Sequence, residues 1–282
     1  MKHVLFNPKS KNGNNEVIIK DLESLIGGEV SSKTSVLDKK EYFSVIESLT
    51  KDDEVYLVGG DGTLHYFVND IKGKDVEYSV YFYAGGTGND FYTDVKKDSD
   101  TKLIKINDYI KELPTVYVNG EERLFINGIG FGIDGYCCEK GDELQAKSDK
   151  PVNYTGIAIK GLLFHYKTPK AKVTVDGVTK EYKKVWLAPT MKGRFYGGGM
   201  MVAPEQDRLN PNKTVTSVVW HKSGKLKTLM VFPSIFKGEH VKQKKLIDIV
   251  EGHHIVVEFD RPTALQIDGE TVSGVTKYEV KA

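Results

Sequence analysis

The sequence contains little cysteine and no long hydrophobic run. Its 282 residues include two cysteines, the adjacent Cys137 and Cys138. Neighbouring cysteines rarely bond to each other, and their spacing fits no metal motif, so we expect neither a disulfide framework nor a cysteine-based metal site. This cysteine usage is typical of a reducing, intracellular setting. No stretch approaches the roughly 18 apolar residues of a membrane-spanning helix, so we expect no transmembrane segment.

The chain also lacks an excess of charge of either sign. It carries 40 Lys and Arg residues against 39 Asp and Glu residues, a net charge of +1. Such a balance does not favour a nucleic-acid partner. The first residues have the pattern of a short strand that ends at Asn7, and their apolar run is too short for a signal peptide. We therefore expect a cytoplasmic protein.

Glycine, by contrast, is abundant and follows apolar strands. Residues 55–58 form a short run of β-forming residues, residues 59–63 read Gly-Gly-Asp-Gly-Thr, and apolar residues then recur at helical spacing up to Ile71. The pattern predicts a strand, a tight turn and a helix, and the backbone N–H groups of such a turn suit phosphate. The Asp61 carboxylate would repel phosphate unless Mg²⁺ lies between them. By itself, this turn could also be purely structural.

A second turn of the same kind makes the structural explanation weaker. Residues 80–83 form a strand that ends in Ala-Gly-Gly-Thr-Gly-Asn-Asp over residues 84–90. In an open α/β sheet both turns lie at the carboxyl ends of strands, where ligands bind. The loop after the first strand carries Lys9, which suits phosphate, although a solvated loop explains it equally well.

The order of elements changes near residue 115. Up to that point strands and helices alternate, which predicts a parallel sheet with right-handed crossovers. Beyond it short strands with alternating polarity dominate, and residues 152–166 form the best helix candidate. The fold class we expect is therefore α/β followed by all-β, with domains over residues 1–120 and 121–271.

Four motifs of the second half leave alternatives open. Residues 127–134 are rich in glycine. This favours a bulged strand or a chain that passes close to another backbone; the alternative is that they line a cleft between the domains. Residues 195–204 combine glycine with Met and suit either a flexible pocket loop or ordinary packing. Residues 229–245 are apolar and then basic, which favours a core helix over an anionic membrane surface. Asp268 and Glu270 follow a short strand and favour a plain turn over a general base.

Taken together, these motifs resemble the diacylglycerol kinase catalytic-domain family, which includes bacterial lipid kinases and sphingosine kinases. The resemblance extends from residue 4 to about residue 275. The turn at residues 59–63 is shared with NAD kinases and phosphofructokinases, whereas the Gly-Thr-Gly-Asn-Asp-Phe of residues 86–91 and the Asp-Gly-Glu of residues 268–270 are more particular to lipid kinases. The family implies a Rossmann-like nucleotide domain and an antiparallel β-sandwich domain, with the last strand (residues 272–282) returning to the first domain.

The resemblance also implies roles for individual residues. Asp90 would join Asp61 in the Mg²⁺ and water network, and Asp268 or Glu270 would serve as the base at the reacting hydroxyl, a choice that the sequence leaves open. Nucleotide binding falls on glycines and polar side chains: Asn7, Lys9, Thr34, Gly59, Gly60, Asp61, Gly62, Thr63, Gly86 and Thr87.

Two departures from the family pattern stand out. Lys11 replaces a usual glycine in the first loop. After Ala203-Pro204 the family usually has an Asp-Gly-x-Leu turn that holds a structural Mg²⁺, but residues 205–211 lack it, which leaves Asp207 as a substitute ligand.

The function we expect is an ATP- and Mg²⁺-dependent lipid kinase that converts diacylglycerol to phosphatidic acid at the membrane surface. A NAD kinase and a non-catalytic nucleotide or lipid sensor are the alternatives. The lipid acceptor and the oligomeric state, including a possible homodimer, are not determined by the sequence.

Overall fold

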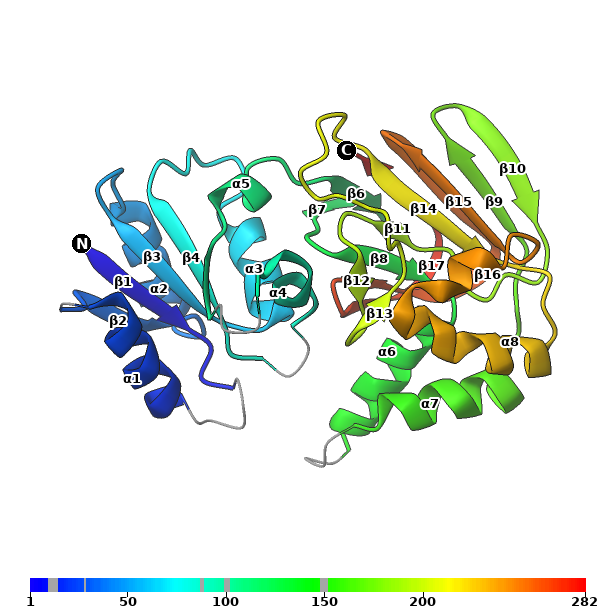
Figure 1. The fold of residues 1–282 in the computed structure, drawn as a ribbon, viewed down its shortest axis with the longest axis horizontal. Coiled ribbons are helices and arrows are strands. Elements are labelled where there is room, and N and C mark those ends of the chain that lie inside the picture. Colours follow the sequence, from blue (N-terminus) through cyan, green and yellow to red (C-terminus); the bar gives the residue numbers. More distant parts are fainter. Residues whose placement is uncertain (10–14, 28, 87–88, 99–101, 148–151) are drawn as a thin grey trace. The chain divides into compact units, whose positions relative to one another are not determined.

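A parallel sheet with helices on both faces forms the first part of the chain (Figure 1). The computed structural model describes residues 1–9, 15–27, 29–86, 89–98, 102–147 and 152–282. The contacts divide these residues into two units, Met1–Leu113 and Pro114–Ala282.

The sheet of the first unit has the strand order β2-β1-β3-β4-β5. The first four strands are parallel, and the short β5 runs antiparallel to β4. The strands are β1 (Lys2–Phe6), β2 (Ser32–Ser35), β3 (Glu54–Gly59), β4 (Ser79–Ala84) and β5 (Leu103–Lys105). The helices are α1 (Asn15–Ile26), α2 (Lys39–Ser48), α3 (Asp61–Asp70), α4 (Asp90–Val95) and α5 (Asn107–Ile110). This arrangement confirms the predicted Rossmann-like α/β class.

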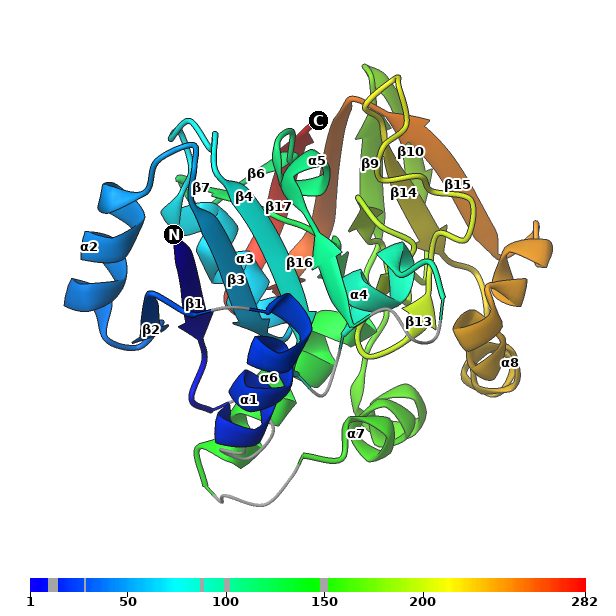
Figure 2. The ribbon, with the colours of Figure 1, turned by 60° about the vertical axis from the view of Figure 1, so that its left-hand side comes forward.

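Burial on both faces explains why β3 is almost wholly apolar. Tyr56 and Val58 pack with Ile18 and Leu22 of α1, and Leu57 on the opposite face is fully buried. A parallel strand covered on both sides reads as a continuous apolar run, as this one does. The polar turn at the end of β3 therefore marks the point where the chain leaves the core (Figure 2).

The second unit is built on a ten-stranded antiparallel sheet, which bears out the predicted β-sandwich. The long hairpin of β16 and β17 forms its centre, and a separate two-stranded ribbon is made by β12 and β13. The strands of the second unit, including the two of the ribbon, are β6 (Thr115–Val118), β7 (Glu121–Leu124), β8 (Gly128–Phe131), β9 (Ala171–Val175), β10 (Val178–Tyr182), β11 (Thr190–Met191), β12 (Phe195–Tyr196), β13 (Met200–Met201), β14 (Val215–Trp220), β15 (Ile247–Gly252), β16 (His254–Ile267) and β17 (Glu270–Lys281).

Helices cover part of this sheet, over a core cluster that includes Trp186, Trp220 and Ile235. They are α6 (Ile133–Gln145), α7 (Tyr154–Lys160), a single turn of π-helix η2 (Gly161–His165), α8 (Lys225–Val231), and the 3₁₀ turns η3 (Phe232–Lys237) and η4 (Glu239–Lys242). No helix in the described ranges combines the length and the apolar composition needed to cross a bilayer.

The structure differs from the sequence-based expectation at three places. The units divide between Leu113 and Pro114 rather than at residue 120. Residues 272–282, expected to return to the first domain, lie in β17, which pairs with β16 and β6 of the second sheet.

The third difference is α6, which we did not predict because glycine normally weakens a helix. At Gly135 the reason for glycine is close packing, because a Cβ atom there would lie 2.1 Å from the Ala264 carbonyl oxygen of β16.

Candidate active site

The two glycine turns of the first unit lie against each other. The Gly85 N–H donates a hydrogen bond of 2.7 Å to the Gly59 carbonyl oxygen. A Cβ atom on Gly86 would lie 2.5 Å from Cα of Gly60, so this backbone approach requires glycine. The ends of β3 and β4 are thus brought together as predicted, at the edge where doubly wound sheets bind ligands.

Asp61 holds the start of α4. Its Oδ2 accepts a hydrogen bond from the Asp90 N–H (2.8 Å), and its Oδ1 accepts one from the Phe91 N–H (2.9 Å). Asp90, the first residue of α4, is buried. The structure therefore brings the two residues expected at a magnesium site together, with the Asp61 carboxylate bound to the backbone at the start of a short helix.

These two residues suit a nucleotide-bound Mg²⁺ better than a resident metal. Mg²⁺ commonly keeps several waters and takes one or two carboxylates together with substrate phosphates. Within the described ranges, no group of three His, Cys, Asp or Glu side chains could hold a metal ion. Asp61 and Asp90 would hold Mg²⁺ together with the phosphates that it accompanies.

Thr63 and Asn7 join the first loop to the first glycine turn. The Asn7 side-chain amide donates to Thr63 Oγ1 at 3.2 Å, and the Asn7 Oδ1 accepts from the backbone N–H of Lys9 at 3.0 Å. Gly59 leaves room for this pair, since a Cβ atom there would lie 2.3 Å from Thr63 Oγ1. Gly62 lies in the first turn of α3. The expected ligand Thr87, and with it Lys11, lies outside the described residues.

Thr34 is placed differently from the other expected nucleotide ligands. It is fully buried in β2, and its hydroxyl donates to Glu41 of α2 at 3.2 Å. Glu41 was not a predicted site residue, because a glutamate in the first turn of a helix is an ordinary feature. In this structure Thr34 ties a strand to a helix.

In the second unit, Asp268 occupies the turn between β16 and β17. Asp268 and Gly269 both have positive φ (48° and 97°), as a two-residue hairpin turn requires. The Asp268 carboxylate accepts three backbone N–H bonds from the segment that enters β8: Ile126 (2.8 Å), Asn127 (2.8 Å) and Gly128 (3.1 Å). Asp268 therefore positions that segment, while Glu270 begins β17 and is half-buried.

A buried arginine that sequence reasoning missed binds the same segment. The Arg208 guanidinium donates to the Ile126 carbonyl oxygen and, at 2.5 Å, to Asn127 Oδ1. Arg208 is 7% exposed and lies 81 to 82 residues along the chain from the residues that it binds. A lone arginine in a polar turn carries no recognisable sequence signal. Asp268 thus binds the backbone N–H groups of residues 126–127, and Arg208 binds oxygen atoms of the same two residues.

A second missed group links two of the glycine motifs. Asp134 at the start of α6 is buried, and its Oδ2 accepts a hydrogen bond from the Tyr196 hydroxyl at 2.8 Å. Burial raises the pKa of Asp134 to about 6. A Cβ atom on Gly130 would lie 1.6 Å from this carboxylate. A Cβ atom on Gly132 would lie 2.4 Å from the Trp186 carbonyl oxygen, so residues 127–134 do pass close to another backbone, as expected.

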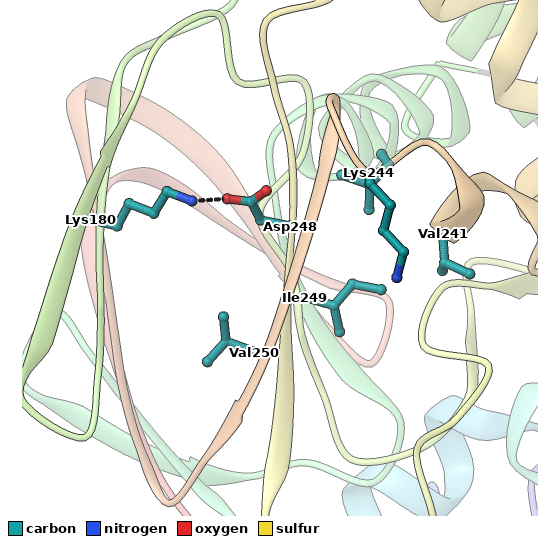
Figure 3. A pocket seen from close by; sticks show the side chains of 7 residues that line it. Lys180, Val241, Lys244, Asp248, Ile249 and Val250 are labelled. Atoms are coloured by element: carbon teal, nitrogen blue, oxygen red, sulfur yellow. Dashed lines mark hydrogen bonds and ion pairs between the residues drawn. The ribbon is translucent and has the colours of Figure 1, made fainter.

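A hollow elsewhere on the second unit involves none of the predicted site residues (Figure 3). It has a volume of about 300 Å³ and lies beside β15, with an ion pair between Lys180 and Asp248 at its wall. It is lined by Lys180, Val241, Lys244, Ile247, Asp248, Ile249 and Val250. Because none of the predicted site residues lines this hollow, we assign it no role in the site.

Comparison with known proteins matches each of the two units to a family profile. The profile of the diacylglycerol kinase catalytic domain matches residues 2–116, and that of the YegS C-terminal NAD kinase beta sandwich-like domain matches residues 127–280. The chain belongs to the diacylglycerol kinase catalytic-domain family.

Relatives within this family are distant. A Mycobacterium tuberculosis (strain ATCC 25618 / H37Rv) protein named diacylglycerol kinase is 24% identical over 197 residues, which cover 67% of this chain and 62% of that protein. The Bacillus subtilis (strain 168) protein YtlR is 27% identical over 212 residues, which cover 66% of this chain and 64% of that protein. The chain thus matches less than two thirds of the length of these relatives.

Solved structures show the same fold. A Bacillus anthracis str. Sterne protein superposes with a TM-score of 0.70 at 19% identity, covering 99% of this chain and 91% of that chain. The crystal structure of a diacylglycerol kinase from the same strain gives a TM-score of 0.62 at 18% identity, covering 99% and 92%. At this identity the likeness speaks for the fold alone.

Residues 205–211 stand where the resemblance implies a structural Mg²⁺ turn. Asp207 is exposed, and its Oδ1 accepts the Leu209 N–H at 2.9 Å. The carbonyl oxygens of the turn accept side-chain amide N–H groups instead: Asn210 donates to Asp207 O (2.8 Å), and Gln206 donates to Thr214 O (3.0 Å). The residues present therefore do not fit a divalent cation at Asp207.

Proposed function

We propose that this chain is an ATP-dependent lipid kinase that transfers the γ-phosphoryl group to a lipid hydroxyl. The observation that carries the proposal is the contact between the Gly60 and Gly86 turns, with Asp61 fastened to the start of α4. Membership of the diacylglycerol kinase family supports the lipid acceptor over a polar one. Diacylglycerol, giving phosphatidic acid, is the acceptor that the name of the Mycobacterium tuberculosis relative favours.

In this proposal the first unit binds the nucleotide. Backbone N–H groups of the glycine turns and the side chains of Asn7, Lys9 and Thr63 would contact the phosphates. Mg²⁺, associated with Asp61 and Asp90, would neutralise charge on the phosphates. Phosphoryl transfer depends mainly on such positioning and charge neutralisation.

The second unit would supply the base. The substrate hydroxyl oxygen forms a bond to the γ-phosphorus, the bond from that phosphorus to the β–γ bridging oxygen breaks, and ADP leaves. We assign the hydroxyl proton to Glu270. Asp268 suits a positioning role better, because both of its oxygens accept backbone N–H groups that taking up a proton would disturb.

The activity test is ATP turnover with Mg²⁺ against a panel of lipids in mixed micelles, with NAD as the soluble control. Transfer to diacylglycerol or another lipid supports the proposal. Transfer to NAD in the absence of lipid would instead indicate a NAD kinase, whose sandwich-like domain this chain shares. ATP binding without any transfer would indicate a sensor and would overturn the proposal.

The Asp61→Ala variant tests the nucleotide half directly. We expect kcat to fall by about 10³- to 10⁵-fold, the scale of charge stabilisation in phosphoryl transfer. Asp38→Ala is a matched control, because Asp38 also caps a helix, α2, through the Glu41 N–H at 3.2 Å. Both variants lose a helix cap, worth roughly 1 kcal/mol of stability. Near-normal turnover of Asp61→Ala would contradict the assigned role.

A further inference from the structure

Two neighbouring helical segments of the second unit expose large apolar side chains. The first consists of α7 and η2, and the second of α8 and η3. Phe164 of η2 and Leu226 of α8 are each 72% exposed, and Met230 of α8 is 75% exposed. Phe236 of η3 and Ile159 of α7 are also exposed. We call the surface formed by α7, η2, α8 and η3 the α7–α8 face.

These segments are held against each other. Lys225 at the start of α8 donates to the Leu163 carbonyl oxygen at 2.7 Å, and α8 contacts η2. Figures 1 and 2 both show α7 and α8 at the same end of the second unit. The exposed side chains therefore belong to one surface.

The helices of this surface are anchored from inside, so their outward apolar residues are not needed for folding. Leu162 and Ile235 are fully buried, and Leu229 and Phe232 pack against the core that contains Trp220. A helix that is apolar on its outer side as well as its inner side is usually covered by something.

The charge of the face indicates what covers it. Neither residues 154–167 nor residues 225–238 contain a single Asp or Glu. They contain five lysines, all exposed: Lys160, Lys167, Lys225, Lys227 and Lys237. Glu239, which follows the second segment, is paired with Lys242. Apolar side chains flanked by these lysines are complementary to a bilayer with anionic headgroups, which offers an apolar interior under a negative surface.

We propose that the α7–α8 face docks on an anionic lipid bilayer, with Phe164, Leu226 and Met230 entering the interface and the lysines at headgroup level. The inference rests on the proposed function in one respect, namely that a lipid kinase must reach its acceptor at a membrane. It goes beyond that function by naming the surface and the sign of the lipid charge. The sequence favoured a core helix here. In the structure, Leu229 of α8 packs against the core, whereas Leu226 and Met230 are exposed.

Sedimentation with vesicles tests the proposal. The full chain is mixed with vesicles of phosphatidylcholine alone or with one third phosphatidylglycerol. We expect binding to the anionic vesicles only, weakening as salt rises. The variant Leu226→Gln with Met230→Gln should bind about a hundredfold more weakly, since it removes two apolar anchors. The variant Lys227→Gln with Lys237→Gln should bind about tenfold to thirtyfold more weakly.

Val178→Gln is the matched apolar control, because Val178 is 76% exposed but lies on β10. Lys74→Gln, an exposed lysine of the first unit, is the matched charge control. Both controls should bind as the unaltered chain does. Since all the altered side chains are exposed, circular dichroism should show every variant folded.

Three results would overturn the inference. They are equal binding to neutral and anionic vesicles, unchanged binding of the two double variants, and a protein dimer in solution that the Leu226→Gln and Met230→Gln variant abolishes, which would assign the face to a second copy.

Assays on short-chain diacylglycerol dispersed as monomers separate this inference from the proposed function. There the double variants should turn over as the unaltered chain does. Vesicle binding through this face without turnover of any lipid would leave the inference standing and defeat the proposed function.

Discussion

Two Asp-Gly turns of the second unit share their local geometry but differ in their surroundings. Asp176-Gly177 joins β9 to β10, and Asp268-Gly269 joins β16 to β17; the aspartates have φ of 46° and 48°. Each carboxylate accepts backbone N–H groups from a distant segment. Asp176 accepts those of His253 (3.0 Å) and His254 (2.8 Å), and Asp268 accepts three from residues 126–128.

The differences are burial and the residue that follows the turn. Asp176 is 45% exposed, whereas Asp268 is 8% exposed beside a segment that also binds Arg208. Two positions beyond the aspartate, the first turn has the exposed Val178 and the second has Glu270. The comparison teaches that an Asp-Gly turn with a bridging carboxylate is a structural device, and that a catalytic role must come from what surrounds it.

Among the variants that test this comparison of the two turns, the largest expected effect is on Glu270, the residue that only the second turn has. Glu270→Gln should lower kcat by about 10²- to 10⁴-fold, the usual contribution of a general base, with the KM for ATP little changed. Steady-state kinetics on the preferred lipid measure this effect. Glu279→Gln, farther along β17, is the control and should be nearly unaffected. Equal losses in the two variants would remove the distinction between the turns.

Asp268→Asn should separate the two turns by stability. Its NH₂ group would face backbone N–H groups in a buried place, so we expect a loss of about 2–4 kcal/mol in the free energy of unfolding. Asp176→Asn, at an exposed turn, should lose less than about 1 kcal/mol. Urea denaturation followed by circular dichroism measures both losses. Similar values would show that burial does not distinguish the two turns.

Asp134 is, like Asp268, a buried carboxylate, but it does not accept the three backbone N–H groups of residues 126–128 that Asp268 accepts. Burial raises its pKa from 3.8 to about 6, so the folded state binds the proton more tightly than the unfolded state does. Its contribution to stability is fully present below about pH 4 and is lost as the pH rises through about 6, a change of up to about 3 kcal/mol.

Asp134→Asn should remove that change. Relative to the unaltered chain, the variant should gain stability between pH 4 and pH 7, as measured by urea denaturation at both values. Asp38→Asn, at an exposed cap, is the control and should follow the unaltered chain. A variant curve parallel to that of the unaltered chain would contradict the raised pKa.

The smallest effect concerns the turn that carries Arg208. Asn210→Ala removes the amide that donates to Asp207 O, so we expect a loss of about 1 kcal/mol, measured by thermal unfolding. Asn212→Ala, two positions on, is the control. Since the amide takes the place of a cation, Mg²⁺ without nucleotide should not restore the loss. Restoration by Mg²⁺ would show that the turn does bind a divalent cation.

Sequence patterns predicted the first unit well because its signals are local. The strands β1, β3 and β4 each contain an apolar run, a turn follows each of them at once, and a right-handed crossover leaves little freedom in where the turns meet. The meeting of Gly60 with Gly86, and of Asp61 with Asp90, followed from that rule.

Patterns were less informative in the second unit. The glycines of α6 hid a helix, because their packing partners are not visible in the local pattern: Gly135 lies against β16, more than a hundred residues away in the sequence, and Gly141 lies against Tyr154 of α7. The roles of Arg208, Asp134 and Tyr196 depend on partners that no local spacing indicates.

The sequence by itself determined the α/β and antiparallel classes of the two units, the glycine turns and the family, because these depend on residue order over short distances. Only the tertiary structure decided that Asp268 is a backbone anchor, that Asp134 is buried with a raised pKa, and that the α7–α8 face is exposed. The physical reason is that burial and hydrogen-bond partners depend on which distant segments pack together, and strand pairings such as that of β8 with β16 fix this only in the folded chain.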